Sequence, residues 1–241
     1  MFLVYGLQKS GIAIVKLLKK QKVNFKIWDD DHRLRELISR KFNKHLFIDP
    51  RKNDLRIFTN IYVSPGISLR QQIFKKLNKL SNLNRDLNIY ISNLKNEKLI
   101  AITGTNGKST TTKLIGDLLR SNKLETFVGG NIGKPLCNAY LSNKNYKYHV
   151  VELSSFQLET IKNINTNISI ITNLASDHLD RYKNINDYVS QKKKIITKTG
   201  INLISLDDKY SRKIFTQKNI KNKISFSLHN KKANIYFGDN F

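Results

Sequence analysis

The stretch Thr-Gly-Thr-Asn-Gly-Lys-Ser-Thr at residues 103–110 constrains this chain more than any other feature. It lies between a β-branched segment that predicts a strand over 99–103 and an apolar pattern that predicts a helix through Leu119. A glycine-rich turn between a strand and a helix lets backbone N–H groups point toward phosphate oxygens, and the helix N-terminus adds a positive dipole. The sequence therefore predicts a phosphate-binding loop on a parallel α/β sheet.

The side chains of this loop suit a nucleoside triphosphate. Lys108 can reach the β- and γ-phosphates, and the hydroxyl of Ser109 can ligate Mg²⁺. The general loop pattern has a glycine five residues before Gly107, where this chain has Ile102. We predict an ATP-binding set made of Gly104, Thr105, Asn106, Gly107, Lys108, Ser109 and Thr110.

Strand and helix patterns alternate along the rest of the chain, which is typical of βαβ units. The expected strands cover 2–5, 25–28, 46–48, 57–63, 99–103, 148–153, 167–173 and 201–206, and the expected helices cover 10–20, 32–42, 68–80 and 187–198. The pattern restarts near residue 90. We therefore expect an α/β fold with two domains: a Rossmann-like domain over 1–93 and a P-loop-type ATPase domain with a mainly parallel sheet over 94–241.

Charge and composition exclude several classes of protein. Lys and Arg number 43 against 18 Asp and Glu, a net charge of +25, but they are spread along the chain beside Asn and Ile, as AT-rich codons favour. No nucleic-acid-specific motif accompanies them, so no specific nucleic-acid partner is expected, and a nucleic-acid binder is the weakest of the alternatives. The single cysteine excludes a disulfide framework. There is no signal peptide pattern and no apolar run of about 18 residues, so a cytoplasmic protein without a membrane span is expected.

Three further segments agree with the phosphate loop in order and spacing. They are Gly-Gly-Asn-Ile-Gly at 129–133, Val-Glu-Leu-Ser-Ser-Phe-Gln-Leu-Glu at 151–159 and Thr-Asn-Leu-Ala-Ser-Asp-His-Leu-Asp-Arg-Tyr at 172–182. With the loop they resemble the Mur ligase family, and within it the branch that adds D-glutamate. The resemblance runs from Gly6 to about Asp208. It implies a monomeric, ATP-dependent and Mg²⁺-dependent amide ligase of peptidoglycan precursor synthesis. ATP would phosphorylate the carboxylate of UDP-N-acetylmuramoyl-L-alanine, and the amine of D-glutamate would attack the acyl phosphate.

Two residues outside the loop are candidate metal ligands. Glu152 ends a predicted strand, at the edge where ligands bind in open α/β sheets. On its own it could equally be a solvated carboxylate, and the resemblance assigns it to Mg²⁺. His178 stands between Asp177 and Asp180, which could fix its tautomer. The resemblance gives His178 a catalytic role at a second Mg²⁺.

Helical spacing singles out one lysine in the run 192–194. Lys192 has apolar residues at i−4, i−3, i+3 and i+4, so it is the one expected to point inward, with a lowered pKa. The matching family lysine, four residues after a tyrosine, is carbamylated and supports a metal. The resemblance therefore makes Lys192 catalytic and, if carbamylated, a metal ligand; a register error of one would make it Lys193.

The N-terminal segment Gly-Leu-Gln-Lys-Ser-Gly at 6–11 partly resembles a dinucleotide-binding turn. Gln8 replaces the second glycine, so we do not predict NAD binding. By resemblance, Ser10, Asp29 and Asp30 bind the uracil-diphosphate end of the substrate, and Asn131 and Ser154 are further substrate-binding residues. Ser-Pro-Gly at 64–66 matches a family turn, whereas Asn88 stands where the family has Glu.

Alternatives from other classes stay open. A sibling Mur or folylpolyglutamate-type ligase shares the ATP loop, and a non-catalytic nucleotide-binding fragment would need only that loop. Family ligases also have a third domain, for which no motif follows Asp208. We expect a central domain that is cut short, and poor turnover by these 241 residues alone.

Overall fold

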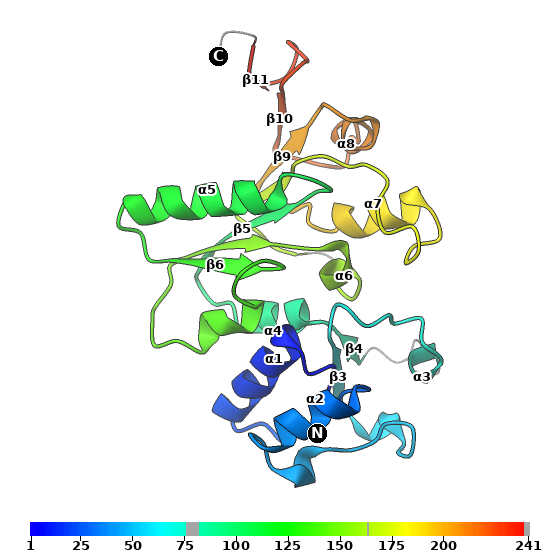
Figure 1. Cartoon of the computed structure of the whole chain (residues 1–241). Helices are drawn as coiled ribbons and strands as arrows, with labels where there is room; N and C mark the ends of the chain where they lie inside the picture. Colours follow the sequence, from blue (N-terminus) through cyan, green and yellow to red (C-terminus); the bar gives the residue numbers. More distant parts are fainter. Residues whose placement is uncertain (76–81, 163, 239–241) are drawn as a thin grey trace. The chain divides into compact units, whose positions relative to one another are not determined.

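The computed structural model describes residues 1–75, 82–162 and 164–238 and divides into two compact units (Figure 1). The first unit comprises Met1–Asn93 and Pro135–Asn143, and the second comprises Leu94–Lys134 and Lys144–Phe241. The short segment Pro135–Asn143 thus joins the first unit, although it lies inside the range 94–241. No helix among the described residues is both long enough and apolar enough to cross a membrane.

The first unit is built on a parallel four-stranded sheet with the order β2-β1-β3-β4. Its strands are β1 (Phe2–Tyr5), β2 (Phe25–Trp28), β3 (Asn60–Val63) and β4 (Leu83–Asn84). Its helices are α1 (Lys9–Lys20), α2 (His32–Ser39), α3 (Gln72–Lys75) and α4 (Asp86–Ser92), with 3-10 turns η1 (Lys44–Leu46), η2 (Leu55–Ile57) and η3 (Leu136–Tyr140).

Several expectations for this unit need correction. The strand predicted over 57–63 begins only at Asn60, and the helix predicted over 32–42 ends at Ser39. The strand predicted at 46–48 was wrong, because the Asn43 side chain accepts from the His45 N–H and starts a 3-10 turn there. Only Phe47 makes an isolated bridge, to Ile27. The helix predicted over 68–80 is present only as α3, and residues 76–81 lie outside the described residues.

Alternation along β1 places core residues on both faces of this sheet. Val4 packs into one cluster with Ile14 and Leu18 of α1, while Leu3 and Tyr5 pack into another with Phe74 of α3. Successive side chains of a strand point to opposite faces, and here both faces are covered. This is why every side chain of the segment 2–5 is aliphatic or aromatic.

The second unit contains a parallel seven-stranded sheet with the order β11-β10-β9-β8-β5-β7-β6. Its strands are β5 (Lys98–Thr103), β6 (Thr126–Gly130), β7 (Tyr148–Glu152), β8 (Ile168–Ile171), β9 (Ile201–Ser205), β10 (Lys223–Ser227) and β11 (Ile235–Tyr236). Its helices are α5 (Lys108–Ser121), α6 (Ser155–Leu158), α7 (Ile185–Lys193) and α8 (Lys209–Phe215). The predicted α/β class with a mainly parallel sheet is confirmed.

Packing and polar contacts fix the helices of this unit. Ile115 and Leu119 of α5 pack over Ile100, Ile102 and Val150 of the central strands. Helix α7 ends at Lys193, earlier than the predicted 198, because the Asn202 side chain pairs with both the N–H and the carbonyl of Thr197. That pairing takes Thr197 out of the helical hydrogen-bond pattern.

A buried arginine fastens the loops of the first unit. Arg85 is fully buried, and its Nη1 donates to the carbonyls of Val63, Ser64 and Ile67 at 3.1, 2.7 and 3.0 Å. The Asn88 side chain accepts from the Arg85 N–H at 3.0 Å and so caps α4. Asn88, at the position where the family has Glu, thus performs helix capping, which its short amide side chain can do.

We predict that Arg85→Met destabilises the first unit by roughly 2–4 kcal/mol, because buried carbonyls lose a charged donor. Urea unfolding followed by the fluorescence of Trp28, the single tryptophan of the chain, measures this directly. The matched control is the exposed Arg33→Met, expected to change stability by less than about 0.5 kcal/mol. Equal effects of the two variants would refute the bracing role of Arg85.

Candidate functional site

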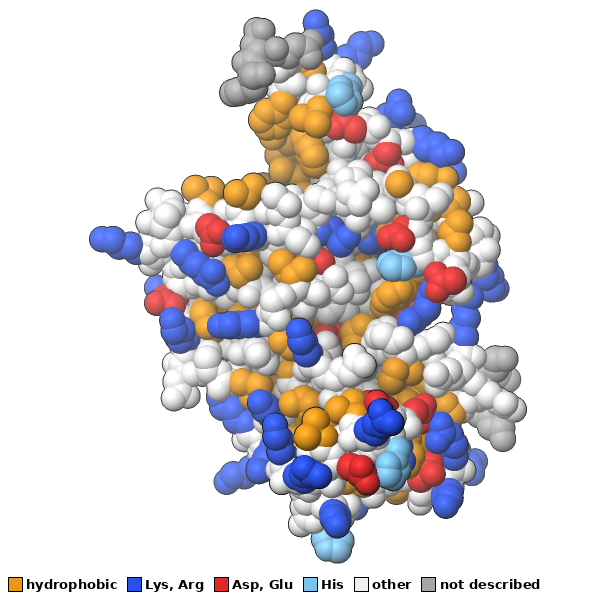
Figure 2. All heavy atoms as spheres, in the orientation of Figure 1, with side chains coloured by type: hydrophobic (Ala, Val, Ile, Leu, Met, Phe, Trp, Pro, Cys, Tyr) orange, Lys and Arg blue, Asp and Glu red, His pale blue; other side chains and the backbone are white. Residues whose placement is uncertain are grey.

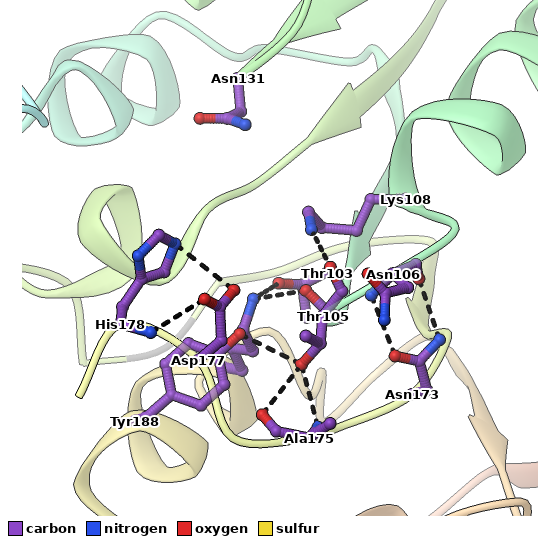
Figure 3. A network of polar contacts seen from close by, with 12 residues as sticks. Thr103, Thr105, Asn106, Lys108, Asn131, Asn173, Ala175, Asp177, His178 and Tyr188 are labelled. Carbon is purple, nitrogen blue, oxygen red and sulfur yellow. Dashed lines mark hydrogen bonds and ion pairs between the residues drawn. The ribbon is translucent and has the colours of Figure 1, made fainter. Parts of the chain in front are cut away.

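The phosphate loop occupies residues 104–107, between the carboxyl end of β5 and the first turn of α5 (Figure 3). Gly107 caps the helix with a φ of 77°, a left-handed conformation that costs glycine little. Gly104 has a φ of 152°, and a Cβ there would lie 1.9 Å from the Thr172 hydroxyl. Both glycines are therefore required by the path of the backbone. The first amides of α5 lack partners within the helix and can receive an anion.

The segment that follows β8 holds this loop in place. The Asn173 side chain accepts from the Asn106 N–H at 2.9 Å and donates to the Asn106 carbonyl at 3.0 Å. The Asn173 carbonyl accepts from the Thr105 N–H at 2.8 Å, and the Thr172 hydroxyl donates to the Asn106 carbonyl at 2.6 Å. These contacts pair the loop with a neighbouring strand end, so its shape is fixed in advance (Figure 3).

Lys108 folds over the loop from the start of α5. Its Nζ donates to the Thr105 carbonyl at 2.7 Å (Figure 3). The flexible lysine stem allows this ammonium to exchange a loop carbonyl for a phosphate oxygen without movement of the backbone. Thr110, also predicted in this set, lies exposed in the first turn of α5.

Glu152 brings a buried carboxylate next to the loop. It ends β7, is 1% exposed, and accepts from the Ser109 hydroxyl at 2.7 Å and from the Asn131 amide at 2.8 Å. Both donors are neutral, so they give each carboxylate oxygen one hydrogen bond without adding a compensating positive charge. The structure thus brings together Ser109, Asn131 and Glu152, three residues singled out by the sequence.

Lys192 points inward from α7 and reaches the underside of the loop. Its side chain is 2% exposed, and Nζ donates to the Gly104 carbonyl at 2.6 Å and to the Thr103 hydroxyl at 3.4 Å. Burial, with a smaller effect of the Lys108 charge, lowers the pKa of Lys192 to about 7, against the opposing effects of Asp177 and Glu152. The alternative Lys193 faces a different pocket, lined also by Lys194 and Thr197. The geometry therefore favours Lys192.

Tyr188, one turn before Lys192, connects the amine to the loop. Its ring lies 4.9 Å from Lys192 Nζ, and its hydroxyl lies 3.2 Å from the Thr105 hydroxyl. Burial raises the pKa of Tyr188. The Thr105 hydroxyl also accepts from the Ala175 N–H at 3.0 Å. In the sequence, Tyr188 is marked only by its four-residue spacing from Lys192. Its contact with Thr105 of the phosphate loop could not be predicted from that spacing.

His178 lies in the segment between β8 and α7, beside Asp177 (Figure 3). Its Nε2 is 3.5 Å from an Asp177 oxygen, and its ring packs on Phe156 at 4.9 Å between centroids. His178 has a φ of 52° and is half exposed. Across the described residues, no three His, Cys, Asp or Glu side chains gather where they could hold a metal ion. No direct contact joins His178 to Glu152.

Ser154, predicted to bind substrate, serves as a helix cap. Its hydroxyl accepts from the Gln157 N–H at 3.3 Å, and the Gln157 side chain accepts from the Ser154 N–H at 3.1 Å. This reciprocal pair starts α6 directly after β7. It fixes the chain next to Glu152.

The candidate substrate residues of the first unit meet at the carboxyl ends of β1 and β2. Asp29 is buried and accepts from the Leu7 N–H at 2.6 Å and the Asp31 N–H at 2.9 Å. Asp30 accepts from the Tyr5 hydroxyl and from Arg51, and these contacts hold the pKa of Asp30 below its usual value against the effect of burial. Ser10 lies in the first turn of α1. Asp29 thus shapes the turn after β1.

Ser64 is a further residue that sequence reasoning did not single out as a tether. Its hydroxyl donates to the Gly6 carbonyl at 2.8 Å, and its own carbonyl accepts from Arg85. The turn at 64–66 and the turn after β1 are thereby fastened to each other. The only sequence signal was the match of 64–66 to a family turn.

Comparisons with known proteins agree with this geometry. The profile of the Mur ligase middle domain matches residues 102–240. The UDP-N-acetylmuramoylalanine–D-glutamate ligase of Rickettsia prowazekii is 39% identical over 219 residues, which cover 88% of this chain and 48% of that protein. The enzyme of the same name from Oenococcus oeni is 34% identical over 98% of this chain and 53% of that protein. The chain spans about half the length of these relatives.

Two solved structures share the fold. The UDP-N-acetylmuramate–alanine ligase MurC of Thermotoga maritima has a TM-score of 0.54 at 21% identity, over 95% of this chain and 53% of that one. The UDP-N-acetylmuramate:L-alanyl-gamma-D-glutamyl-meso-diaminopimelate ligase from Neisseria meningitides has a TM-score of 0.57 at 12% identity, over 93% of this chain and 77% of that one. With the profile match over more than half of its length, the chain belongs to the Mur ligase family.

Proposed function

We propose that this chain carries the ATP site and the substrate-nucleotide site of a ligase that joins D-glutamate to UDP-N-acetylmuramoyl-L-alanine. One observation carries the proposal: a preformed phosphate loop is contacted by a buried amine, Lys192, at the Gly104 carbonyl, and a buried carboxylate, Glu152, accepts from the hydroxyl of Ser109 directly after the loop. An ordinary glycine-rich turn needs neither group. The names of the relatives supply the substrates. We propose a cytoplasmic location and a monomer, and the sequence gives no reason to expect nucleic acid as a partner.

The reaction requires little covalent chemistry from the protein. A carboxylate oxygen of UDP-N-acetylmuramoyl-L-alanine attacks the γ-phosphorus of ATP, and ADP leaves. The amine of D-glutamate then attacks the acyl carbon, and inorganic phosphate leaves. Such phosphoryl transfer depends on positioning and on neutralisation of negative charge. The amides at 104–110 and Lys108 would hold the phosphates, and Asn131 would stand near the acceptor substrate.

The donors present suit Mg²⁺. Magnesium in nucleotide sites is held by one or two carboxylates or hydroxyls together with phosphate oxygens. Glu152 and Ser109 offer such oxygens and are already 2.7 Å apart. When bound, the ion neutralises charge on the transferring phosphoryl group. We propose His178 and a carbamylated Lys192 as ligands of a second ion.

The state of the Lys192 amine supports the proposed carbamylation. The ammonium first loses one proton. The neutral nitrogen then attacks CO₂, a C–N bond forms as a C=O π bond opens, and a second proton leaves, so that a cation becomes an anion. Because burial places the pKa of Lys192 near 7, about half of this amine is neutral at pH 7. An ordinary lysine, with a pKa near 10.4, is almost wholly protonated there.

A ligation assay tests the proposed function. In the presence of Mg²⁺, we expect slow phosphate release from ATP that requires both UDP-N-acetylmuramoyl-L-alanine and D-glutamate, with the amide product confirmed by mass spectrometry.

Lys108→Ala should weaken ATP binding roughly 10- to 100-fold, because one charge-assisted contact is lost. Lys113→Ala, an exposed lysine on the outside of α5, is the matched control. Phosphate release that is identical with and without the two substrates would contradict the proposal.

We predict that ¹³C-labelled bicarbonate produces one carbamate signal, from the buried amine of Lys192, in the ¹³C NMR spectrum of the chain. The signal should grow between pH 6 and pH 8, because the neutral fraction of Lys192 rises as the pH passes its pKa of about 7. Lys192→Arg should abolish the signal and Lys193→Arg should retain it. Loss in the Lys193 variant alone would move the assignment by one residue and overturn our geometry.

A further inference from the structure

A second pocket lies in the second unit, formed by the end of α7 and the loops that follow. Its volume is about 520 Å³, within the range of small-molecule sites. Ten residues line it, and none is acidic; five are lysines, namely Lys162, Lys193, Lys194, Lys198 and Lys221, and the others are Ser190, Ile196, Thr197, Asn219 and Ile220.

The pocket and the phosphate loop occupy opposite edges of the sheet. Lys162 precedes β8, residues 196–198 precede β9, and residues 219–221 precede β10. The phosphate loop follows the carboxyl end of β5, and the strands are parallel. Lys192 and Lys193 diverge accordingly: the first reaches Gly104 and the second lines the pocket. The two sites are therefore separate.

One buried side chain fastens two walls of this pocket together. Asn202 has no exposed surface, and its amide accepts from the Thr197 N–H at 2.9 Å. The same amide donates to the carbonyls of Thr197 and Lys221, at 3.0 Å each. The Ser169 hydroxyl donates to its oxygen at 2.7 Å and fixes its orientation. The walls are therefore set before any ligand arrives, which reduces the ordering cost of binding.

The lysines differ in what their ammonium groups do. Lys194 donates to the carbonyls of Leu158 and Glu159 at 3.0 and 2.8 Å, so its charge is already engaged. Within the part of the chain that the structure describes, the other four ammonium groups make no hydrogen bond or ion pair. Like charges around one concave surface raise its positive potential, and a multivalent anion relieves their repulsion.

Abundance of lysine does not by itself explain this pocket. Lys and Arg side chains are scattered over the face of the molecule in Figure 2, without a continuous basic stripe. What distinguishes the pocket is its fixed concave shape, the absence of acidic lining residues and the neutral donor of Asn219 beside the lysines. A flat surface with the same charges would bind counterions only diffusely.

We propose that this pocket binds a compact polyanion of the phosphate class, held by Lys193, Lys198 and Lys221. The site is distinct from the phosphate loop and does not depend on the ligase proposal. A chain of linked phosphates presents several negative charges to the several lysines that line this one pocket. A nucleic-acid backbone, being longer, would extend beyond the pocket.

Titration with inorganic tripolyphosphate tests the proposal. The Lys108→Ala variant is used so that anion binding at the phosphate loop is weakened. The backbone amide NMR signals are the readout. We expect the signals of Thr197, Lys198 and Lys221 to shift in saturable fashion. The triple variant Lys193→Ala, Lys198→Ala, Lys221→Ala in the same background should bind about tenfold more weakly. The control triple variant Lys113→Ala, Lys144→Ala, Lys231→Ala removes the same charge elsewhere and should bind as before.

Three outcomes would overturn the proposal. Shifts confined to residues 104–110 would leave only the phosphate loop as an anion site. Equal weakening in the two triple variants would reduce the effect to net charge. A short single-stranded oligonucleotide that shifts the same signals at lower concentration than tripolyphosphate would make the pocket part of a nucleic-acid surface. Thermal melting of each variant separates loss of binding from loss of fold.

Discussion

A buried lysine beneath the phosphate loop is the constraint around which the second unit is organised. A cation removed from water is costly unless polar groups receive it, and here the Gly104 carbonyl and the Thr103 hydroxyl do so. That contact joins the end of β5 to α7. Tyr188 links the same helix to Thr105, and Asn173 pairs with the backbone of Asn106. All of these contacts restrict the same short loop, so together they hold it in one conformation.

The first unit uses the same principle at the carboxyl ends of its strands. Asp29 receives the Leu7 N–H, Ser64 donates to the Gly6 carbonyl, and Arg85 donates to carbonyls around the turn at 64–66. In each case a buried side chain satisfies the backbone of a neighbouring loop. Irregular backbone at a ligand-binding edge cannot satisfy itself, so side chains from adjacent strand ends must do this.

Sequence patterns predicted the parallel α/β class and most of the central strands, because buried parallel strands are continuous β-branched runs. They also singled out Lys192 in its run of three, because helical periodicity distinguishes neighbours that face different environments. Patterns failed where long-range polar contacts decide the outcome. The side chain of Asn202, which lies in β9, accepts from the Thr197 N–H after the end of α7. The side chain of Asn43 accepts from the His45 N–H, and a 3-10 turn forms where a strand was expected. The loop-holding role of Asn173 depends on the pairing of β5 with β8, which no local window contains.

The most direct test of the proposed ATP site is a crystal structure of the chain with a non-hydrolysable ATP analogue and Mg²⁺. We predict that the phosphates lie on the amides of residues 104–110 and that Lys108 Nζ leaves the Thr105 carbonyl for a phosphate oxygen. Glu152 and Ser109 should then both face the ion, with Asn173 still paired to Asn106. A nucleotide bound elsewhere, with Lys108 and Glu152 in their present contacts, would contradict the account.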